Sequence, residues 1–345
     1  MTKLPVRIAL TVLCLALVMA LPFAVSSPYL LGDAMWAMLD EGEDSGLLSL
    51  LIPAARAEVV TEYDYELPVD FTPGYAPDPA CFNETGYEDA SIRVQMETRE
   101  EGGVTYRIAW VEIASPTQLR TGIAGDKVTS KKTGTVLNMA KQYNAVVAMN
   151  GDYFVDNPTK TSFEYRMNQK VRAKTNKLKD ILIIDQNGDF HTFVKSQGIT
   201  VNKNDVAAEG VEGPIINAFT FGPALVQKGQ LLTCDKDYGY NPSGREPRSA
   251  IGQLDTLSYV MVIAEGRGDS AGVTHQELAN FMYSLGCVEA FNLDGGGTAC
   301  MALPYHPDQD AFGASKGYYN ELGGSERPQS DIIYFATAVA PESGK

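Results

Sequence analysis

Alternating apolar and polar positions predict strands at several points along the chain. Residues 92–96 and 106–110 both carry an apolar side chain at every second position. A period of two places those side chains on one face of an extended strand. Short apolar runs at residues 145–149, 288–293 and 331–338 predict further strands that are buried.

Turn residues between these strand-like runs predict hairpins. Residues 181–185 and 190–193 flank the segment 186–189, which contains an Asn-Gly pair. Asn-Gly between two β-rich runs is the strongest short-range signal for a hairpin. Two more hairpins are predicted, one around residues 228–229 and one within residues 249–265.

Helical periodicity appears in two places. Apolar residues within Thr135–Tyr143 recur at the spacing of a helix that leads into the next strand. A second helix is predicted to begin at Thr274, because Thr274 and Glu277 form the Thr-x-x-Glu pattern of a capping box. It is predicted to end at Gly286, a residue suited to a left-handed C-terminal cap.

These elements predict an α+β fold for residues 92–340. We expect a single strand-rich domain with a few helices packed on a mixed sheet. A length of about 250 residues suits one domain. A hydrophobic segment and a linker precede this domain.

The N-terminus has the pattern of a targeting segment. Lys3 and Arg7 precede an almost wholly apolar run, Ile8–Val25, as in the basic and hydrophobic regions of an export signal. We expect residues 1–27 to be a signal peptide or a signal anchor, because the run is close to the shortest that spans a bilayer. The protein is therefore expected to be exported. It would be membrane-anchored and face outside, or be secreted if the signal is cleaved.

Residues 28–91 are predicted to be an acidic linker that contains proline and tyrosine. From Glu58 to Ile92 there are nine acidic residues and no Lys or Arg. A solvated spacer is the favoured interpretation, and an acidic binding arm is the alternative.

Charge and motif content exclude several classes of function. Lys and Arg total 28 against 43 Asp and Glu, so the net charge is −15 at pH 7. Such an acidic chain has no overall attraction for nucleic acid. P-loop and dinucleotide-binding glycine motifs are missing from the sequence, which argues against ATP and NAD. The three histidines lack zinc-hydrolase spacing, so no cofactor is expected, and a divalent cation such as calcium is the alternative.

The cysteines leave the redox state of the domain open. Cys81, Cys234, Cys287 and Cys300 follow the N-terminal segment and contain no Cys-x-x-Cys pair. An oxidising compartment would allow three pairings, while buried free thiols fit a domain of this size equally well.

Polar residues and glycines gather where predicted strands begin or end. Asn150, Gly151 and Asp152 follow one strand, and Asp294–Thr298, with three consecutive glycines, follow another. Consecutive glycine amides can form an anion-holding nest, although a plain turn explains the same residues. The other strand-adjacent segments carry a small set of arginines and carboxylates, namely Arg248, Glu265, Arg267, Glu326 and Arg327.

Six segments in a fixed order resemble the phosphodiester glycosidase family. They are AVVAMNGDYF, FGPALVQKGQ, PRSAIGQ, EGR, AFNLDGGGT and ERPQSDIIYF, and the resemblance covers roughly residues 106–336. Two positions depart from the family pattern, since Asp152 stands where glycine is common and Glu265 where aspartate is common. The added carboxylate of Asp152 bears on substrate identity more than on fold.

The resemblance implies an exported hydrolase that cleaves the sugar–phosphate bond of a sugar-1-phosphodiester in an envelope or extracellular glycan. Asp294 is the first candidate to activate water, with Glu326 and Glu265 as catalytic alternatives. Arg248, Arg327 and the Gly295, Gly296 and Gly297 amides are expected on the leaving phosphate. The remaining expected substrate-binding residues are Asn150, Gly151, Asp152, Arg267 and Thr298.

Two other classes of function stay open. The chain could be a non-catalytic glycan-binding or exopolysaccharide-assembly module that kept the fold. It could also be a metal-dependent phosphodiesterase that cuts the P–O bond on the acceptor side. The sequence identifies neither the sugar nor the acceptor.

Overall fold

The computed structural model describes residues 69–152, 154, 162–202, 205–310, 317–322 and 325–340. The predicted signal segment and most of the predicted linker lie outside the described residues. Within the described part, no helix is long and apolar enough to cross a membrane.

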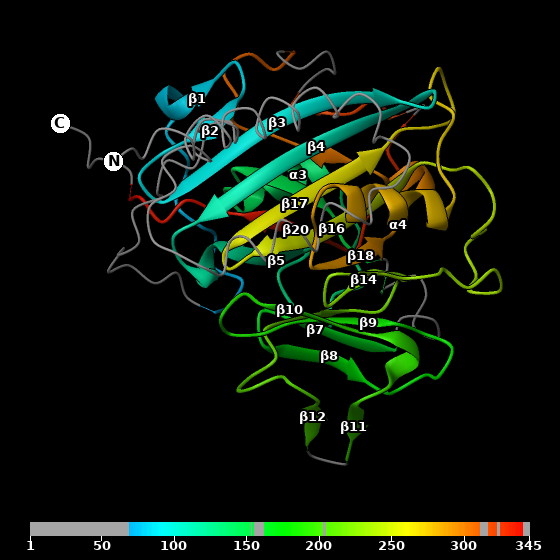
Figure 1. The fold of residues 1–345 in the computed structure, drawn as a ribbon. Coiled ribbons are helices and arrows are strands. Elements are labelled where there is room, and N and C mark those ends of the chain that lie inside the picture. Colours follow the sequence, from blue (N-terminus) through cyan, green and yellow to red (C-terminus); the bar gives the residue numbers. More distant parts are fainter. Residues whose placement is uncertain are drawn as a thin grey trace, which may run out of the picture. The chain divides into compact units, whose positions relative to one another are not determined.

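A nine-stranded sheet dominates the fold (Figure 1). Its strands, in spatial order, are β1 (Phe82–Asn83), β2 (Gly86–Glu88), β3 (Ile92–Glu101), β4 (Val104–Ile113), β17 (Ser258–Ala264), β16 (Arg248–Asp255), β18 (Glu289–Leu293), β14 (Ala224–Gln227) and β15 (Gln230–Leu231). The three predicted hairpins are confirmed, two of them in this sheet as β14–β15 and β16–β17.

Three smaller sheets complete the described strands. The four-stranded sheet has the order β19 (Met301–Ala302), β6 (Val147–Asn150), β20 (Asp331–Phe335) and β5 (Leu119–Ile123). The five-stranded sheet has the order β10 (Phe190–Phe193), β9 (Ile181–Ile184), β13 (Asn217–Phe219), β7 (Phe163–Arg166) and β8 (Gln169–Ala173). A hairpin of β11 (Ile199–Val201) and β12 (Val206–Ala208) extends from it in Figure 1.

The described part of the chain contains two α-helices, α3 (Val136–Gln142) and α4 (His275–Ser284). The predicted capping box of α4 is confirmed, since Thr274 Oγ1 accepts from the Glu277 amide at 3.1 Å and the Glu277 carboxylate accepts from the Thr274 amide at 2.8 Å. Gly286 has a φ of +86°, as the predicted left-handed cap requires. Short 3₁₀ helices lie at Pro79–Cys81, Pro116–Gln118, Val194–Ser196 and Gly296–Thr298.

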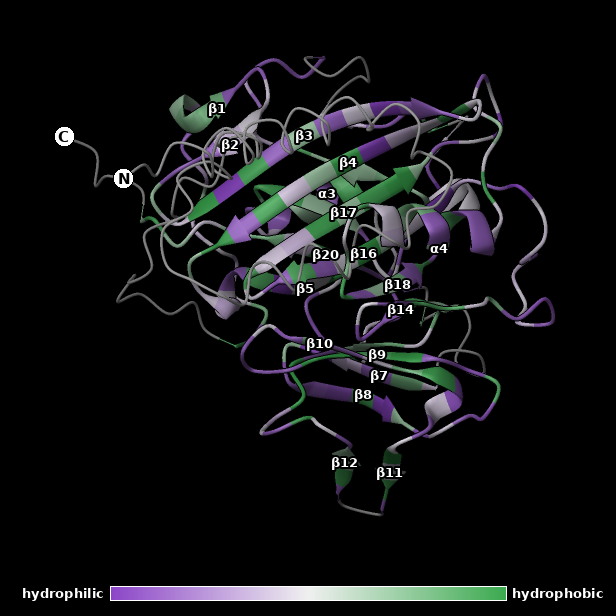
Figure 2. Cartoon of the chain, in the orientation of Figure 1, coloured by the Kyte–Doolittle hydropathy of each residue, from purple (hydrophilic) through white to green (hydrophobic). Residues whose placement is uncertain are grey.

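The strand β17 is almost wholly apolar because both of its faces are buried. Its alternate residues Met261 and Ile263 pack into a core shared with Met149 of β6 and Ile333 of β20. The intervening residues, including Val262, pack on the other face beneath α4. Both faces of the large sheet are therefore buried here, between α4 on one side and the four-stranded sheet on the other. By contrast, β3 and β4 show alternating bands of hydropathy in Figure 2.

The helix α3 covers the opposite face of the four-stranded sheet. Met139 and Ala140 pack with Ile332 and Tyr334 in a separate apolar cluster. The order of layers is therefore α4, nine-stranded sheet, four-stranded sheet and α3. Each layer buries one apolar face of its neighbour, which is how helices and sheets form a stable domain.

Two findings differ from the sequence-based expectations. The predicted mixed sheet is wrong, because every strand pair among the described residues is antiparallel. For example, β18, which follows α4, lies between β16 and β14 and runs antiparallel to both. Strands β1 and β2 also lie within the range expected to be linker, where Phe82 and Tyr87 are buried.

The cysteines Cys81, Cys234, Cys287 and Cys300 are free thiols.

Candidate active site

Strand register brings several of the predicted site segments to one end of the large sheet. Arg248, the first residue of β16, pairs with Ala264, the last residue of β17. Its neighbour Ser249 pairs with Leu293, the last residue of β18. The segments that follow β17 and β18 and the one that precedes β16 therefore emerge side by side.

Asp294 lies at the centre of this end. Its carboxylate Oδ2 accepts a hydrogen bond from Arg327 Nη2 at 3.2 Å, and Oδ1 accepts from the Gly295 amide at 2.8 Å. The residue is only 3% exposed, and burial raises its pKa to about 7, although Arg327 opposes the shift. A carboxyl group with this pKa can exchange a proton near neutral pH, as a general acid or base must.

Two exposed arginines flank the glycine loop, which we define as residues 295–297. The Arg327 side chain is 60% exposed, and its backbone amide donates to the Gly297 carbonyl at 2.9 Å. Arg267 is 53% exposed and donates two hydrogen bonds to Glu246, at 2.9 and 2.7 Å. A Cβ on Gly296 would lie 3.1 Å from Arg267 Nη2, so glycine leaves room for this guanidinium. Arg327 supplies positive charge beside Asp294, while Arg267 lies against the glycine loop.

The glycine loop uses much of its own hydrogen-bonding capacity. The Gly296 amide donates to the Pro247 carbonyl at 2.7 Å, and the Gly295 amide is engaged by Asp294. Thr298, 1% exposed, donates from Oγ1 to the Gly295 carbonyl at 2.6 Å. These bonds shape the loop, and the positive charge that faces solvent comes from the arginines.

Asn150 supports the site from below. Its Oδ1 accepts from Ser249 Oγ at 2.7 Å and from the Cys300 amide at 3.1 Å. Its Nδ2 donates to the Asp294 carbonyl at 2.6 Å. The fully buried amide therefore joins β6 to the start of β16 and positions the backbone of Asp294, rather than facing solvent.

Arg248 faces away from Asp294. Alternation along β16 puts Ser249 on the Asn150 side and Arg248 on the side of α4. The Arg248 guanidinium donates to the carbonyls of Val273, Asn241 and Gly244, at 2.9, 2.7 and 3.0 Å. Burial lowers its pKa to about 10. It holds together the loop that precedes β16.

The two alternative catalytic carboxylates also have structural partners. Glu265 Oε1 accepts from Arg107 Nε at 2.7 Å and from the Glu321 amide at 2.9 Å. Glu326 accepts from the Val136 amide, the first of α3, at 2.5 Å and from Tyr318 Oη at 2.7 Å. No hydrogen bond or ion pair between described residues joins either glutamate to Asp294.

A buried ionic cluster adjoins the site, and the sequence predictions include only one of its members, Asp152. Arg166 Nε donates to Asp331 Oδ2 at 2.6 Å, and Arg166 Nη2 lies 3.0 Å from Glu164 Oε2. Asp152 Oδ2 accepts from the Thr220 amide at 2.7 Å. All four charged side chains have no exposed surface. The sequence signal was the pair Glu164 and Arg166 at alternate positions of a short aromatic run, which puts both on one face of β7.

Three carboxyl groups share one guanidinium in this cluster. Asp152 Oδ1, both carboxyl oxygens of Glu164 and Asp331 Oδ1 make no hydrogen bond. Burial raises the pKa of Asp152, of Glu164 and, to about 7, of Asp331, with Arg166 opposing each shift. The cluster therefore favours retention of protons at neutral pH. Among the described residues, no group of three or more His, Cys, Asp or Glu is arranged to hold a metal ion.

Gly151 links the cluster to Asp294. Its carbonyl accepts from the Asp294 amide at 3.3 Å, and its amide donates to the Asp331 carbonyl at 3.1 Å. A Cβ at this position would lie 2.5 Å from Asp331 Oδ2. Only glycine permits this close approach, so Gly151 serves packing between the two acidic groups.

Comparison with known proteins identifies a family and relatives that this chain is similar to. A family model described as phosphodiester glycosidase matches residues 143–336. A curated relative, the SPbeta prophage-derived uncharacterized protein YomE of Bacillus subtilis strain 168, is 26% identical over 173 residues, which are 49% of this chain and 26% of that one. The chain thus spans about a quarter of that relative's length.

A solved structure shows the same fold. The catalytic domain of zebrafish N-acetylglucosamine-1-phosphodiester alpha-N-acetylglucosaminidase, auto-inhibited by its pro-peptide, superposes with a TM-score of 0.52 at 18% identity. The match covers 71% of this chain and 83% of that domain.

Proposed function

The chain belongs to the phosphodiester glycosidase family, and on this basis we propose that it hydrolyses the sugar–phosphate bond of a sugar-1-phosphodiester. The observation that carries the proposal is the pairing of a buried carboxyl group, Asp294, with the exposed guanidinium of Arg327. Asp294 can transfer a proton, and the adjacent Arg327 can bind the phosphate.

The proposed reaction needs few groups. Water attacks the anomeric carbon while its proton passes to Asp294, and the bond from that carbon to the phosphate oxygen breaks. The phosphate leaves as a monoester, so its charge grows from one negative unit to about two as the reaction proceeds. Arg327 and Arg267 are the groups that stabilise this growing charge. Because phosphate is a good leaving group, one carboxylate suffices.

The proposed substrate is an envelope or extracellular glycan, and the proposed location is outside the cytoplasm. Support for export is the pattern of residues 1–27, with basic residues followed by an apolar run. Under this proposal the protein is anchored in the membrane through that run or is secreted after cleavage. The acidic surface and the exposed arginines suit a glycan better than nucleic acid.

Product analysis tests the proposed reaction. The purified chain is incubated with uridine diphosphate N-acetylglucosamine, with and without a chelator, and the products are identified by mass spectrometry. Free sugar with intact nucleoside diphosphate supports the proposal. Sugar-1-phosphate among the products would instead indicate a phosphodiesterase, and loss of activity under chelator would indicate a metal ion.

The variant Asp294→Asn tests the assigned residue. We expect its rate to fall by a factor of about 10² to 10⁴, the usual contribution of a general acid or base. Asp205→Asn, an exposed position beside β12, is the matched control and should retain the wild-type rate. A folded Asp294→Asn protein with the full rate would refute the assignment, and full binding without hydrolysis by the wild type would favour a glycan-binding module.

A further inference from the structure

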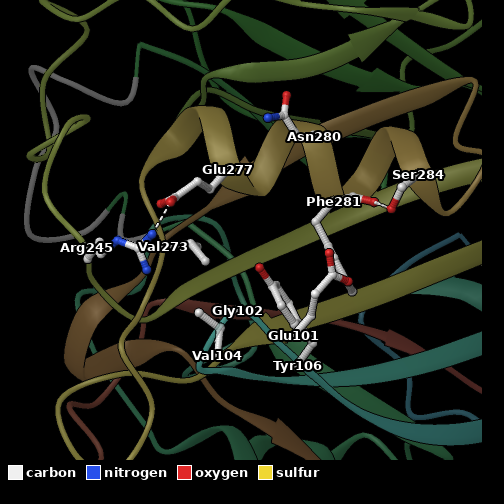
Figure 3. A pocket seen from close by; sticks show the side chains of 10 residues that line it. All are labelled: Glu101, Gly102, Val104, Tyr106, Arg245, Val273, Glu277, Asn280, Phe281 and Ser284. Atoms are coloured by element: carbon white, nitrogen blue, oxygen red, sulfur yellow. Dashed lines mark hydrogen bonds and ion pairs between the residues drawn. The ribbon is translucent and has the colours of Figure 1, made fainter. Parts of the chain in front are cut away.

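A pocket of about 400 Å³ opens between α4 and the turn that joins β3 to β4 (Figure 3). Its side chains come from elements far apart in the sequence, and they converge on one hollow in the close-up view. We call it the α4 pocket and define it by Glu101, Tyr106, Arg245, Glu277, Asn280 and Phe281. None of these residues takes part in the reaction proposed above.

The base of the α4 pocket is a rigid aromatic pair. The rings of Tyr106 and Phe281 stack with centroids 3.6 Å apart and planes 8° from parallel. The Arg99 guanidinium lies 5.8 Å from the Phe281 centroid. Tyr106 and Phe281 are buried, at 6% and 4% exposure. The rings form a fixed apolar base, so a ligand is selected by the polar rim above them.

The rim carries both hydrogen-bond acceptors and donors. Glu277 and Arg245 form an ion pair across the pocket, drawn as a dashed line in Figure 3. The Glu101 side chain makes no hydrogen bond or ion pair with a described residue and is exposed. Asn280 is exposed on α4, and its Oδ1 accepts from Gln276 at 3.2 Å, so its amide hydrogens remain for a ligand.

The charge of the rim selects the kind of ligand. Glu101 and Glu277 outnumber Arg245, so the rim carries a net negative charge and disfavours a phosphate group. Carboxylates accept hydrogen bonds from hydroxyl groups, while amide and guanidinium groups donate to them. A neutral sugar unit, with several hydroxyls on a compact ring, matches this combination and fits a cavity of this volume.

One short segment joins the α4 pocket to the phosphate-binding arginines. Arg245 lines the pocket, Glu246 holds Arg267 at 2.7 Å, and the Pro247 carbonyl accepts from the Gly296 amide at 2.7 Å. Three consecutive residues therefore contact, in order, the α4 pocket, Arg267 and the glycine loop. The pairing of Tyr106 with Ala264 puts the base of the pocket at the same end of the sheet.

We propose that the α4 pocket is a subsite for a neutral sugar unit of a larger glycan whose phosphodiester lies at Asp294. This inference rests on the proposed function, because it places the sugar and the phosphate in one substrate. It makes the substrate an oligosaccharide or polymer rather than a free nucleotide sugar. The negatively charged rim would bind a neutral sugar unit of the glycan, and the two exposed arginines would bind its phosphodiester.

Direct binding tests the subsite without requiring hydrolysis. Maltotriose, cellotriose, mannotriose and chitotriose are titrated against the full chain by ligand-observed NMR. We expect at least one to bind, and binding to weaken about tenfold or more in Glu101→Ala/Asn280→Ala, since about 1.4 kcal/mol corresponds to each factor of ten. Glu100→Ala, the adjacent exposed glutamate, is the matched control and should bind as the wild type does.

Parallel hydrolysis of uridine diphosphate N-acetylglucosamine separates the two proposals. Loss of trisaccharide binding with unchanged hydrolysis supports the subsite, because this small diester carries no further sugar chain. Loss of trisaccharide binding in a chain that leaves this nucleotide sugar intact supports the subsite alone, and the proposed function is then tested by hydrolysis of a glycan phosphodiester. If no trisaccharide binds the wild type, or if the double variant binds normally, the subsite is refuted even where hydrolysis is found.

Discussion

Asp294 is almost fully buried, yet its carboxylate accepts a hydrogen bond from the exposed guanidinium of Arg327. Burial and the nearby Asp152 raise its pKa, to about 7, while Arg327 lowers it. As a general base, Asp294 acts only when ionised. We therefore expect kcat/KM to rise as the pH increases through about 7 and to level off above it.

Alanine variants of Arg327 and Arg267 distinguish the roles of the two arginines. Arg327→Ala removes a cation that stabilises the ionised form of Asp294, so the pH at which kcat/KM reaches half its plateau should move upward. The plateau itself should fall by a factor of about 10 to 10³, because a donor to the leaving phosphate is lost. Steady-state kinetics between pH 5 and 9 measure both changes.

Arg267→Ala is the comparison. Arg267 is paired with Glu246 and makes no ion pair with Asp294 among the described residues, so its loss should lower the plateau without moving the midpoint. An unshifted midpoint in Arg327→Ala would show that Arg327 does not control the protonation of Asp294.

Gly151 offers a stability test at the same scale. A Cβ at this position would lie 2.5 Å from Asp331 Oδ2, which is itself held 2.6 Å from Arg166 Nε. The Asp331 carboxylate cannot move away from the added methyl group without breaking its ion pair with Arg166. Gly151→Ala should therefore lower the free energy of unfolding by about 1–3 kcal/mol. Urea denaturation measures the change. Gly268→Ala, where no heavy atom lies within 4 Å of the added Cβ, should change stability by less than about 0.5 kcal/mol.

At the scale of elements, Glu326 caps a helix. Its carboxylate accepts from the Val136 amide at the start of α3, where the helix dipole also favours negative charge. Glu326→Ala should therefore destabilise the protein by about 1 kcal/mol and leave kcat/KM within about twofold of the wild type. Thr274→Ala, which removes the cap of α4, should cost a similar amount. If the Glu326→Ala variant is fully folded but loses most of its kcat/KM, Glu326 takes part in catalysis.

Local signals in the sequence predicted the elements well. The capping box of Thr274 and Glu277 and the hairpin after Ile184 involve residues close in sequence, so their patterns carry the information. Strand direction was not predictable in this way. The direction of β18 is determined by its contacts with β14 and β16, which pair with it through residues many positions away.

The predicted site shows the same division between local and distant information. Alternation indicates that Arg248 and Ser249 face opposite sides of β16, but only the packed structure shows that Ser249 faces Asn150. The buried cluster joins Arg166 of β7 to Asp331 of β20, from different sheets. No spacing in the sequence identifies such a contact.

At the scale of the whole molecule, acidity and stability are linked. The chain carries a net charge of −15, and its buried cluster places three carboxyl groups around Arg166. The pKa of Asp331 is raised to about 7, and the pKa values of Asp152 and Glu164 are raised as well. Groups with raised folded-state pKa values bind protons more tightly in the folded protein than in the unfolded chain.

The stability contributed by these carboxyl groups falls as the pH rises. Below the unfolded-state pKa values the carboxyl groups are protonated in both states, and the stability they contribute is fully present. That stability is lost as the pH rises through the folded-state values, which for Asp331 lies near 7. We expect the melting temperature to fall as the pH is raised from 6 to 8, which calorimetry at constant ionic strength measures.

Glu164→Gln assigns this slope to the cluster. Glutamine has the shape of the protonated glutamic acid but cannot ionise, and its side-chain oxygen can keep the 3.0 Å contact with Arg166 Nη2. Stability below about pH 4 should change little, because the carboxyl group is then protonated in both states. At pH 6 the variant should already exceed the wild type, and at pH 8 by more, since each pH unit over which Glu164 is ionised only in the unfolded chain costs the wild type about 1.4 kcal/mol. Glu100→Gln, on the surface, should keep the wild-type slope. Equal slopes in wild type and Glu164→Gln would show that Glu164 does not titrate in this range, and would leave Asp331 as the group in the cluster that does.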